Sequence, residues 1–206
     1  METPETLRIF IGYDPRQPVS FNVLAQSIMV RATKPIAITP LIIQTLPIQR
    51  VGLTPFTFTR FLVPYLCDYK GWGLFLDADI ILRDDISQLF ALRDEKYTVM
   101  VSKNEHRFEW ASVMLFNNAK CQILTPDYIE KADRLHQIAW EDETKIGDLP
   151  REWNHLVGYD KERTDAKLVH TIRRAFPVSL RRMIPNMRKI GWTNRNGLMR
   201  RNLGKY

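Results

Sequence analysis

The chain has 206 residues, of which 45% are hydrophobic, enough for one α/β domain with a full core and an appendage. The first residues are polar and acidic, and no apolar run reaches the length of a membrane span. We therefore expect neither a signal peptide nor a transmembrane helix. Cys67 and Cys121 form no CxxC pair, which predicts buried thiols in a reducing compartment and a cytoplasmic protein.

The net charge of +7 is unevenly distributed along the chain. Residues 171–206 contain ten basic residues and no acidic one, which leaves 20 of the 30 basic residues against all 23 acidic ones in residues 1–170. The charge distribution predicts one mildly acidic folded domain over residues 1–170 and a basic C-terminal tail over residues 171–206. The basic side chains of the tail are suited to bind phosphate groups. We therefore expect the protein to attach peripherally to an anionic membrane surface through the tail. We do not expect nucleic acid, because the body is acidic and carries no nucleic-acid-binding motif.

The first third of the chain alternates between strand and helix patterns. Residues 7–12 form a β-branched and aromatic run closed by glycine, which predicts a strand, and prolines mark a turn after it. From Ser20, a plausible N-cap, apolar residues recur at helical spacing. Residues 36–43 predict a second strand, which Pro40 restricts to a sheet edge or a bulge.

The remaining elements continue the alternation. Residues 57–69 have one apolar helical face, in which Pro64 indicates a kink or an early stop. Further strands are predicted at residues 72–76, 97–102 and 112–116, and a helix from Thr125 to about Trp140. This order predicts an α/β domain with three layers and a mostly parallel central sheet.

Two aspartates, Asp77 and Asp79, follow the most apolar of these strands. Carboxylates at i and i+2 of an extended segment project the same way and would meet just past the carboxyl end of the strand. Ligands bind at that end in open α/β sheets, and a divalent cation bridging substrate phosphates would relieve the repulsion between the carboxylates. The alternative is that one aspartate caps the next helix and the other is solvated.

Several segments resemble GT-A-fold glycosyltransferases, and most of all glycosyltransferase family 8, which includes glycogenin and bacterial galactosyltransferases. The resemblance covers residues 7–160. It rests on the opening strand and turn at residues 9–14 with its helix, the Thr-x-x-Arg helix at residues 57–66, the DxD motif at residues 77–79, the strand at residues 112–117, and the Leu-Pro-x-x-Trp-Asn segment within residues 148–154.

The resemblance implies a hexosyltransferase that moves a hexose from a nucleotide-diphosphate sugar, UDP-linked in this family, with retention of anomeric configuration. The acceptor would be a glycan, a lipid-linked molecule or a protein. It implies Mn²⁺ or Mg²⁺ held by Asp77, Asp79 and His170. The donor would be bound by these residues: Ile11, Tyr13, Asp14, Arg60, Asp77 and Ala78.

Three further roles are implied by the resemblance, each with a competing interpretation. Asp142 is the candidate for a stabilising role near the sugar ring, unless residues 141–143 are only a solvated acidic loop. Trp153 and Asn154 would shape the sugar or acceptor pocket, although a buried tryptophan needs no ligand to explain it. Arg60 would face the donor phosphates, unless it is a surface arginine paired with Asp68.

The sequence departs from the family pattern after His170, where the family's glycines and proline-tryptophan pair are absent. The alternative function is therefore a catalytically weakened relative that binds nucleotide, or an anionic surface through its tail. The other three histidines, His106, His136 and His155, are expected on surfaces or in loops.

Overall fold

The structure is a computed structural model that describes residues 5–105 and 107–171. The chain divides into two units, residues 1–172 and residues 173–206. The basic tail predicted for residues 171–206 therefore lies, apart from Thr171, outside the described residues. Within the described part of the chain, no helix is both long enough and apolar enough to cross a bilayer.

The larger sheet has the strand order β2-β1-β3-β6-β5-β7. Of the strands described in this sheet, β6 alone runs against the others, which confirms the prediction of a mostly parallel central sheet. Its strands are β1 (Leu7–Gly12), β2 (Ile36–Leu41), β3 (Trp72–Leu76), β5 (Val99–Val101), β6 (Val113–Asn117) and β7 (Ile146–Asp148). β2 is an edge strand, as Pro40 required.

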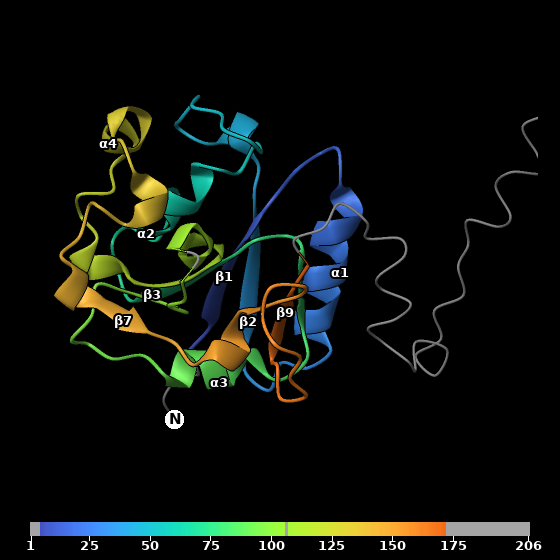
Figure 1. Cartoon of the computed structure of the whole chain (residues 1–206). Coiled ribbons are helices and arrows are strands. Elements are labelled where there is room, and N and C mark those ends of the chain that lie inside the picture. The colour runs from blue at the N-terminus through green and yellow to red at the C-terminus, as the bar shows by residue number, and fades with distance from the viewer. Residues whose placement is uncertain (1–4, 106, 172–206) are drawn as a thin grey trace, which may run out of the picture. The chain divides into compact units, whose positions relative to one another are not determined.

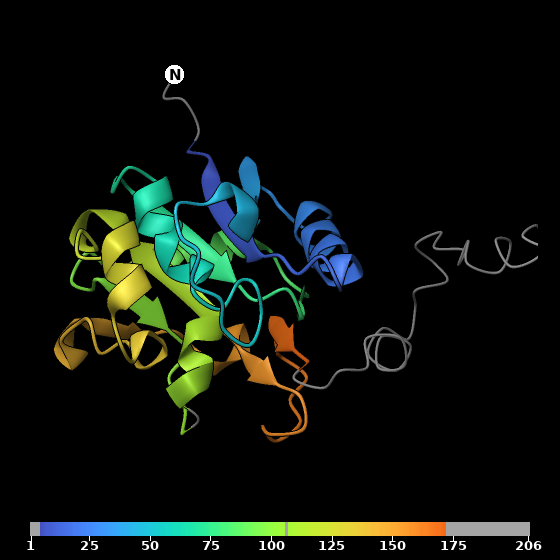
Figure 2. The same cartoon turned by 90° about the horizontal axis from the view of Figure 1, so that it is seen from above.

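Helices pack on both faces of this sheet (Figures 1 and 2). The α-helices are α1 (Pro18–Met29), α2 (Val63–Leu66), α3 (Ile86–Ala91) and α4 (Pro126–Lys131). Short 3₁₀ helices connect many elements: η1 (Ile43–Thr45), η2 (Thr59–Leu62), η3 (Arg107–Ser112), η4 (Asn118–Lys120), η5 (Leu135–Gln137), η6 (Glu143–Lys145) and η7 (Arg151–Trp153).

The side chains of β3 show how the sheet separates two cores. All five residues of β3 are buried, because β1 and β6 flank it and both faces are covered. Leu74 and Leu76 face the core beneath α1 and α3, whereas Phe75 faces the core beneath α2 and α4. The period of two along the strand thus supplies both hydrophobic layers of a three-layer domain.

A second, three-stranded sheet has the order β4-β9-β8 and was not predicted. β4 (Ile80–Leu82) pairs antiparallel with β9 (Leu168–His170), and β9 pairs parallel with β8 (His155–Leu156). These strands have two or three residues each, too short for a periodic signal. His155, expected on a surface or in a loop, is instead a buried residue of β8.

The predicted helix boundaries need three corrections. α1 begins at Pro18, whose fixed φ suits a first turn, and Ser20 is a buried helical residue rather than the N-cap. Residues 57–69 form η2 and the four-residue α2 instead of one helix. α4 starts at the Thr125 cap as predicted but ends at Lys131 rather than Trp140, since Ala132 already has an extended backbone.

Candidate metal and nucleotide site

The two aspartates of the motif flank a turn at the end of β3. Asp77 follows the last residue of β3, and Ala78 and Asp79 form the turn that leads into β4. The backbone N–H of Asp77 donates to the carbonyl of Ser112, at 2.9 Å, which continues the pairing of β3 with the β6 segment. The carboxylates therefore converge because the chain turns between two strands, not because the segment is extended.

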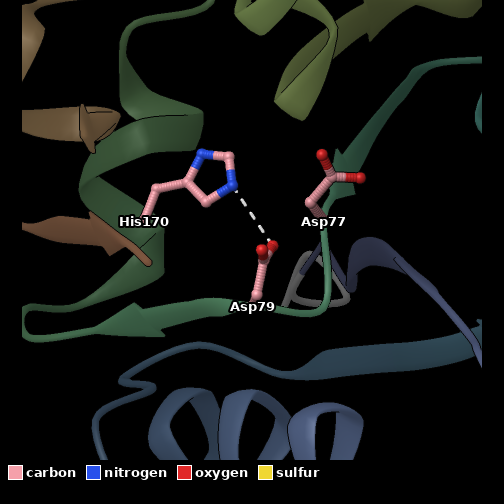
Figure 3. A group of neighbouring side chains, drawn as sticks. All are labelled: Asp77, Asp79 and His170. Atoms are coloured by element: carbon pink, nitrogen blue, oxygen red, sulfur yellow. Dashed lines mark ion pairs between the residues drawn. The ribbon is translucent and has the colours of Figure 1, made fainter. Parts of the chain in front are cut away.

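Strand pairing brings His170 to this turn from ninety residues away in sequence. The register of β4 and β9 places Ile80 opposite His170. Thr171 continues the pairing, because its backbone N–H and its hydroxyl both donate to the carbonyl of Asp79, at 3.0 and 2.9 Å. Nε2 of the buried His170 lies 3.2 Å from Oδ1 of Asp79 (Figure 3).

Asp77, Asp79 and His170 form a donor set suited to a divalent cation. One ligand atom from each residue lies within 4.8 Å of the other two. The buried Oδ1 of Asp77 accepts no hydrogen bond of acceptable geometry from the described part of the chain, although Nη2 of Arg60 lies 3.0 Å from it, so a lone pair remains for a cation. Two carboxylates and one imidazole match the oxygen and nitrogen ligands of Mn²⁺, and Mg²⁺ also accepts carboxylate oxygen. The residues present therefore fit the expected cation.

Arg60 is the charged partner of Asp77. Nη2 of Arg60 lies 3.0 Å from Oδ1 of Asp77, and Nη1 lies 3.3 Å from Oδ2 and 2.7 Å from the carbonyl of Ala111. Arg60 is buried, so the alternative of a surface arginine paired with Asp68 is wrong. The exposed Asp68 pairs with Lys70 instead.

The charges of the site shift the pKa values of two of its members. Burial raises the pKa of the Asp77 carboxyl, and the guanidinium of Arg60 opposes this shift. For His170, burial alone would lower the pKa, but the hydrogen bond to Asp79 and the nearby carboxylates raise it. Both shifts arise because the buried Asp77 and His170 lie close to each other and to the charges of their neighbours.

Glu109 and Asn154 complete the surroundings of His170. Nδ1 of His170 lies 3.3 Å from Oδ1 of Asn154 and 3.8 Å from Oε2 of Glu109. Glu109 is a buried carboxylate in η3, and its Oε2 accepts a hydrogen bond of 2.9 Å from the hydroxyl of Ser112. Sequence reasoning missed Glu109, since a single acid in a 3₁₀ turn carries no local signal of its long-range contacts.

The other residues expected to bind the donor lie at the carboxyl ends of β1 and β3. Ile11 is fully buried in the sheet, and Ala78 is buried in the turn after β3. Tyr13 packs edge-on against Phe21, with ring centroids 5.8 Å apart. The carboxylate of the buried Asp14 accepts hydrogen bonds from Arg16, which lower the pKa of Asp14. Base and ribose binding by these residues stays a prediction.

Two other candidates have clear structural roles in this structure. Asp142 is exposed, and its carboxylate accepts from the backbone N–H and the hydroxyl of Thr144, so it caps η6. Trp153 is 1% exposed and belongs to the core beneath α1, and the ammonium of Lys167 lies 5.0 Å from the centre of its ring. Their predicted roles at the sugar ring and in the acceptor pocket remain untested.

Solved structures with the same arrangement are GT-A glycosyltransferases. The bifunctional glycosyltransferase WbbM matches with a TM-score of 0.64 and 14% identity, over 82% of this chain and 46% of its own, so this chain spans less than half of WbbM. The galactosyltransferase LgtC, in complex with donor and acceptor sugar analogues, matches with a TM-score of 0.56 and 12% identity, over 82% of this chain and 88% of its own. GlyE of Streptococcus pneumoniae TIGR4 matches with a TM-score of 0.59 and 17% identity, over 82% of this chain and 55% of its own. At these identities the likeness shows the fold, which is the predicted GT-A fold.

Sequence comparison adds one relative. No protein-family model matches the chain. Protein CDI of Arabidopsis thaliana is 33% identical over 202 residues, an alignment that covers 81% of this chain and 77% of the relative. That identity extends over most of both chains, far beyond a shared motif. The chain belongs to the same family as Arabidopsis Protein CDI.

Proposed function

We propose that this protein is a metal-dependent glycosyltransferase of family 8 that moves a hexose from a nucleotide-diphosphate sugar, UDP-linked, to an acceptor with retention of configuration. The observation that carries the proposal is the cluster of Asp77, Asp79 and His170 at the carboxyl end of an interior strand. That is the edge of an α/β sheet where ligands bind, and here it lies in a GT-A fold.

The charges of the cluster suit such a reaction. When bound, a divalent cation such as Mn²⁺ or Mg²⁺ would neutralise the negative charge that develops on the departing nucleoside diphosphate. Asp77, Asp79 and His170 would hold it. Asp79 is the most exposed of the three, with a side chain 37% exposed. Arg60 would orient the carboxylate of Asp77 through the paired contacts described above.

The substrate class rests on the resemblance and on the solved relatives. LgtC is a galactosyltransferase whose structure contains donor and acceptor sugar analogues, which favours a hexose donor and a glycan acceptor for this chain. A lipid-linked or protein acceptor is compatible with the same site. This proposal also includes the expected donor contacts, which are those of Ile11, Tyr13, Asp14, Arg60, Asp77 and Ala78.

Calorimetric titration of UDP and UDP-hexoses, with and without Mn²⁺, tests the proposal without knowledge of the acceptor. Wild-type protein should bind UDP in the presence of Mn²⁺, and Asp79→Ala should abolish the Mn²⁺-dependent part of the binding. The matched control is Asp133→Ala, at an exposed aspartate that follows α4, and it should bind as wild type does. Equal UDP binding by wild type and Asp79→Ala in Mn²⁺ would show that the metal assignment is wrong.

A further inference from the structure

Asn154 is a fully buried amide whose side chain contacts both Glu109 and His170. It lies between η7 and β8, and its exposed fraction is 0%. Its Nδ2 donates to the backbone carbonyl of Glu109 at 3.3 Å, and this fixes which way the amide faces. Its Oδ1 is therefore the atom presented to Nδ1 of His170, at 3.3 Å, and an amide oxygen can only accept a hydrogen bond.

Glu109 approaches the same nitrogen from η3. Its carboxylate is anchored by the hydroxyl of Ser112, and its Oε2 lies 3.8 Å from Nδ1 of His170. Ser112 also accepts the backbone N–H of Asp77 through its carbonyl. One residue thus connects the carboxylate behind the imidazole to the first aspartate of the cluster, so both sides of the site share a single rigid support.

We propose that Asn154 and Glu109 are positioning residues that keep a proton on Nδ1 of His170 and direct Nε2 as the ligating atom toward Asp79 and the cation. The inference rests on the proposed metal site. An amide oxygen and a carboxylate both favour a protonated Nδ1, and Nε2 already lies 3.2 Å from Asp79. A histidine ligand whose second nitrogen donates to an oxygen is held in one tautomer and one ring orientation, which raises its affinity for the metal.

The first measurement is the affinity of the full-length protein for Mn²⁺ alone, from the electron paramagnetic resonance signal of free Mn²⁺. Asn154→Leu keeps the volume but removes the accepting oxygen, and it should weaken Mn²⁺ binding by about 10- to 100-fold. Asn154→Asp keeps an oxygen opposite Nδ1 but loses the donor to the carbonyl of Glu109, so it should bind Mn²⁺ more tightly than Asn154→Leu does. Glu109→Gln keeps the size of the side chain and an oxygen for Ser112, and it should weaken binding less than Asn154→Leu does.

Asn118 offers a matched control. It is also a buried amide with an exposed fraction of 0%, and its Nδ2 donates to the carbonyl of Lys70, but it lies beside the beginning of β3 rather than its end. Asn118→Leu removes a comparable buried hydrogen bond. It should lower the thermal midpoint and leave the Mn²⁺ affinity unchanged.

The second measurement reports the proton directly. The chain has four histidines, so two-bond ¹H–¹⁵N spectra of ¹⁵N-histidine-labelled protein contain signals from only four imidazole rings. The signals that disappear in His170→Gln are those of His170. With diamagnetic Zn²⁺ as the probe, wild type should show a protonated Nδ1 and a metal-bound Nε2. Asn154→Leu should show a mixture of ring forms or no bound form.

The outcomes separate this inference from the function on which it rests. If wild type binds Mn²⁺ and both Asn154→Leu and Glu109→Gln bind it equally well, the positioning role is wrong and the metal site stands. A wild-type His170 bound to Zn²⁺ through Nδ1 also overturns it. If wild type binds neither cation, the metal site itself is wrong. Should Asn154→Leu not fold, Glu109→Gln and the wild-type spectrum still decide the question.

Discussion

Arg60 and Asp77 form a two-point ion pair in which both side chains are mostly buried, at 8% and 12% exposure. The contacts of 3.0 and 3.3 Å use both oxygens of the carboxylate. The guanidinium is held in place by the carbonyls of Ala111 and Thr57, to which Nη1 and Nε donate. Without a cation, the positive charge of Arg60 therefore offsets the cost of burying the Asp77 carboxylate. A cation at the site would supply part of the same compensation.

The first prediction concerns this pair. Arg60→Met leaves Asp77 buried without its partner charge, and we expect a loss of about 3–5 kcal/mol in the free energy of unfolding, measured with urea. Mn²⁺ should recover more of that stability in the variant than it adds to wild type, because the cation replaces the missing positive charge.

The control removes the carboxylate charge as well. In Arg60→Met combined with Asp77→Asn, no unpaired charge remains, so the double variant should be more stable than Arg60→Met alone. Its stability should also no longer respond to Mn²⁺. If Arg60→Met alone were as stable as wild type, the ion pair would contribute nothing and the argument would fail.

The parts of the fold that local patterns determine could be predicted from the sequence. The run at residues 72–76 is apolar on both faces, and only an interior strand of a covered sheet needs that pattern. Residues 7–12 are β1 as predicted. The prediction that Asp77 lies at the carboxyl end of the interior strand is confirmed, because the acidic motif directly follows the apolar run in sequence.

The parts that depend on pairing between distant segments could not be predicted. β4, β8 and β9 are too short to show a period, yet their pairing is what carries His170 to Asp79. His170 was named because of a resemblance, not because any local feature indicated its neighbour. Glu109 was missed for the same reason, since its contacts with Ser112 and His170 exist only after β6 and β9 are in place.

The second prediction concerns pH and His136. This side chain packs edge-on against the rings of Phe58 and Phe61, with centroids 5.6 and 5.2 Å away. Burial lowers the pKa of His136 to about 4, and the nearby charges of Arg60 and Arg50 act in the same direction. Below about pH 6.5, His136 of the unfolded chain becomes protonated, whereas His136 of the folded protein stays neutral down to about pH 4. The free energy of unfolding should therefore fall as the pH drops from about 6.5 to about 4.

Urea unfolding at a series of pH values checks this. His136 should account for at most about 3 kcal/mol of the loss between pH 6.5 and pH 4. His136→Gln has no proton to gain, so its stability should fall less steeply than that of wild type over the same window. Above pH 7 the two profiles should run parallel. Profiles that are parallel throughout would show that His136 titrates normally in the folded protein.

The third prediction concerns the contact between α2 and β3. A Cβ at Gly73 would lie 2.8 Å from Cγ1 of Val63 and 3.3 Å from Sγ of Cys67, closer than side chains pack. Gly73→Ala should therefore cost about 1–3 kcal/mol of stability through overpacking. In a Val63→Ala background the nearest of these obstacles is removed, and the same substitution should cost less. An equal cost in both backgrounds, measured by urea unfolding, would show that Val63 is not the obstacle.

The last prediction concerns the basic tail, whose residues after Thr171 lie outside the described part of the structure. Ten basic residues without an acidic one, interspersed with apolar and aromatic residues, predict attachment to an anionic membrane surface. Each basic residue near such a surface would contribute about 1 kcal/mol, and salt would reduce this. The full-length protein should therefore co-sediment with vesicles that contain anionic lipid, but not with neutral ones, and about 300 mM salt should release it.

Replacing Arg181, Arg182, Arg188 and Lys189 by Gln should weaken co-sedimentation. The matched control replaces four exposed lysines of the folded domain, Lys34, Lys96, Lys145 and Lys161. It removes the same charge, so an equal loss of binding in both variants would mean that the net charge of the protein, rather than the tail, determines attachment.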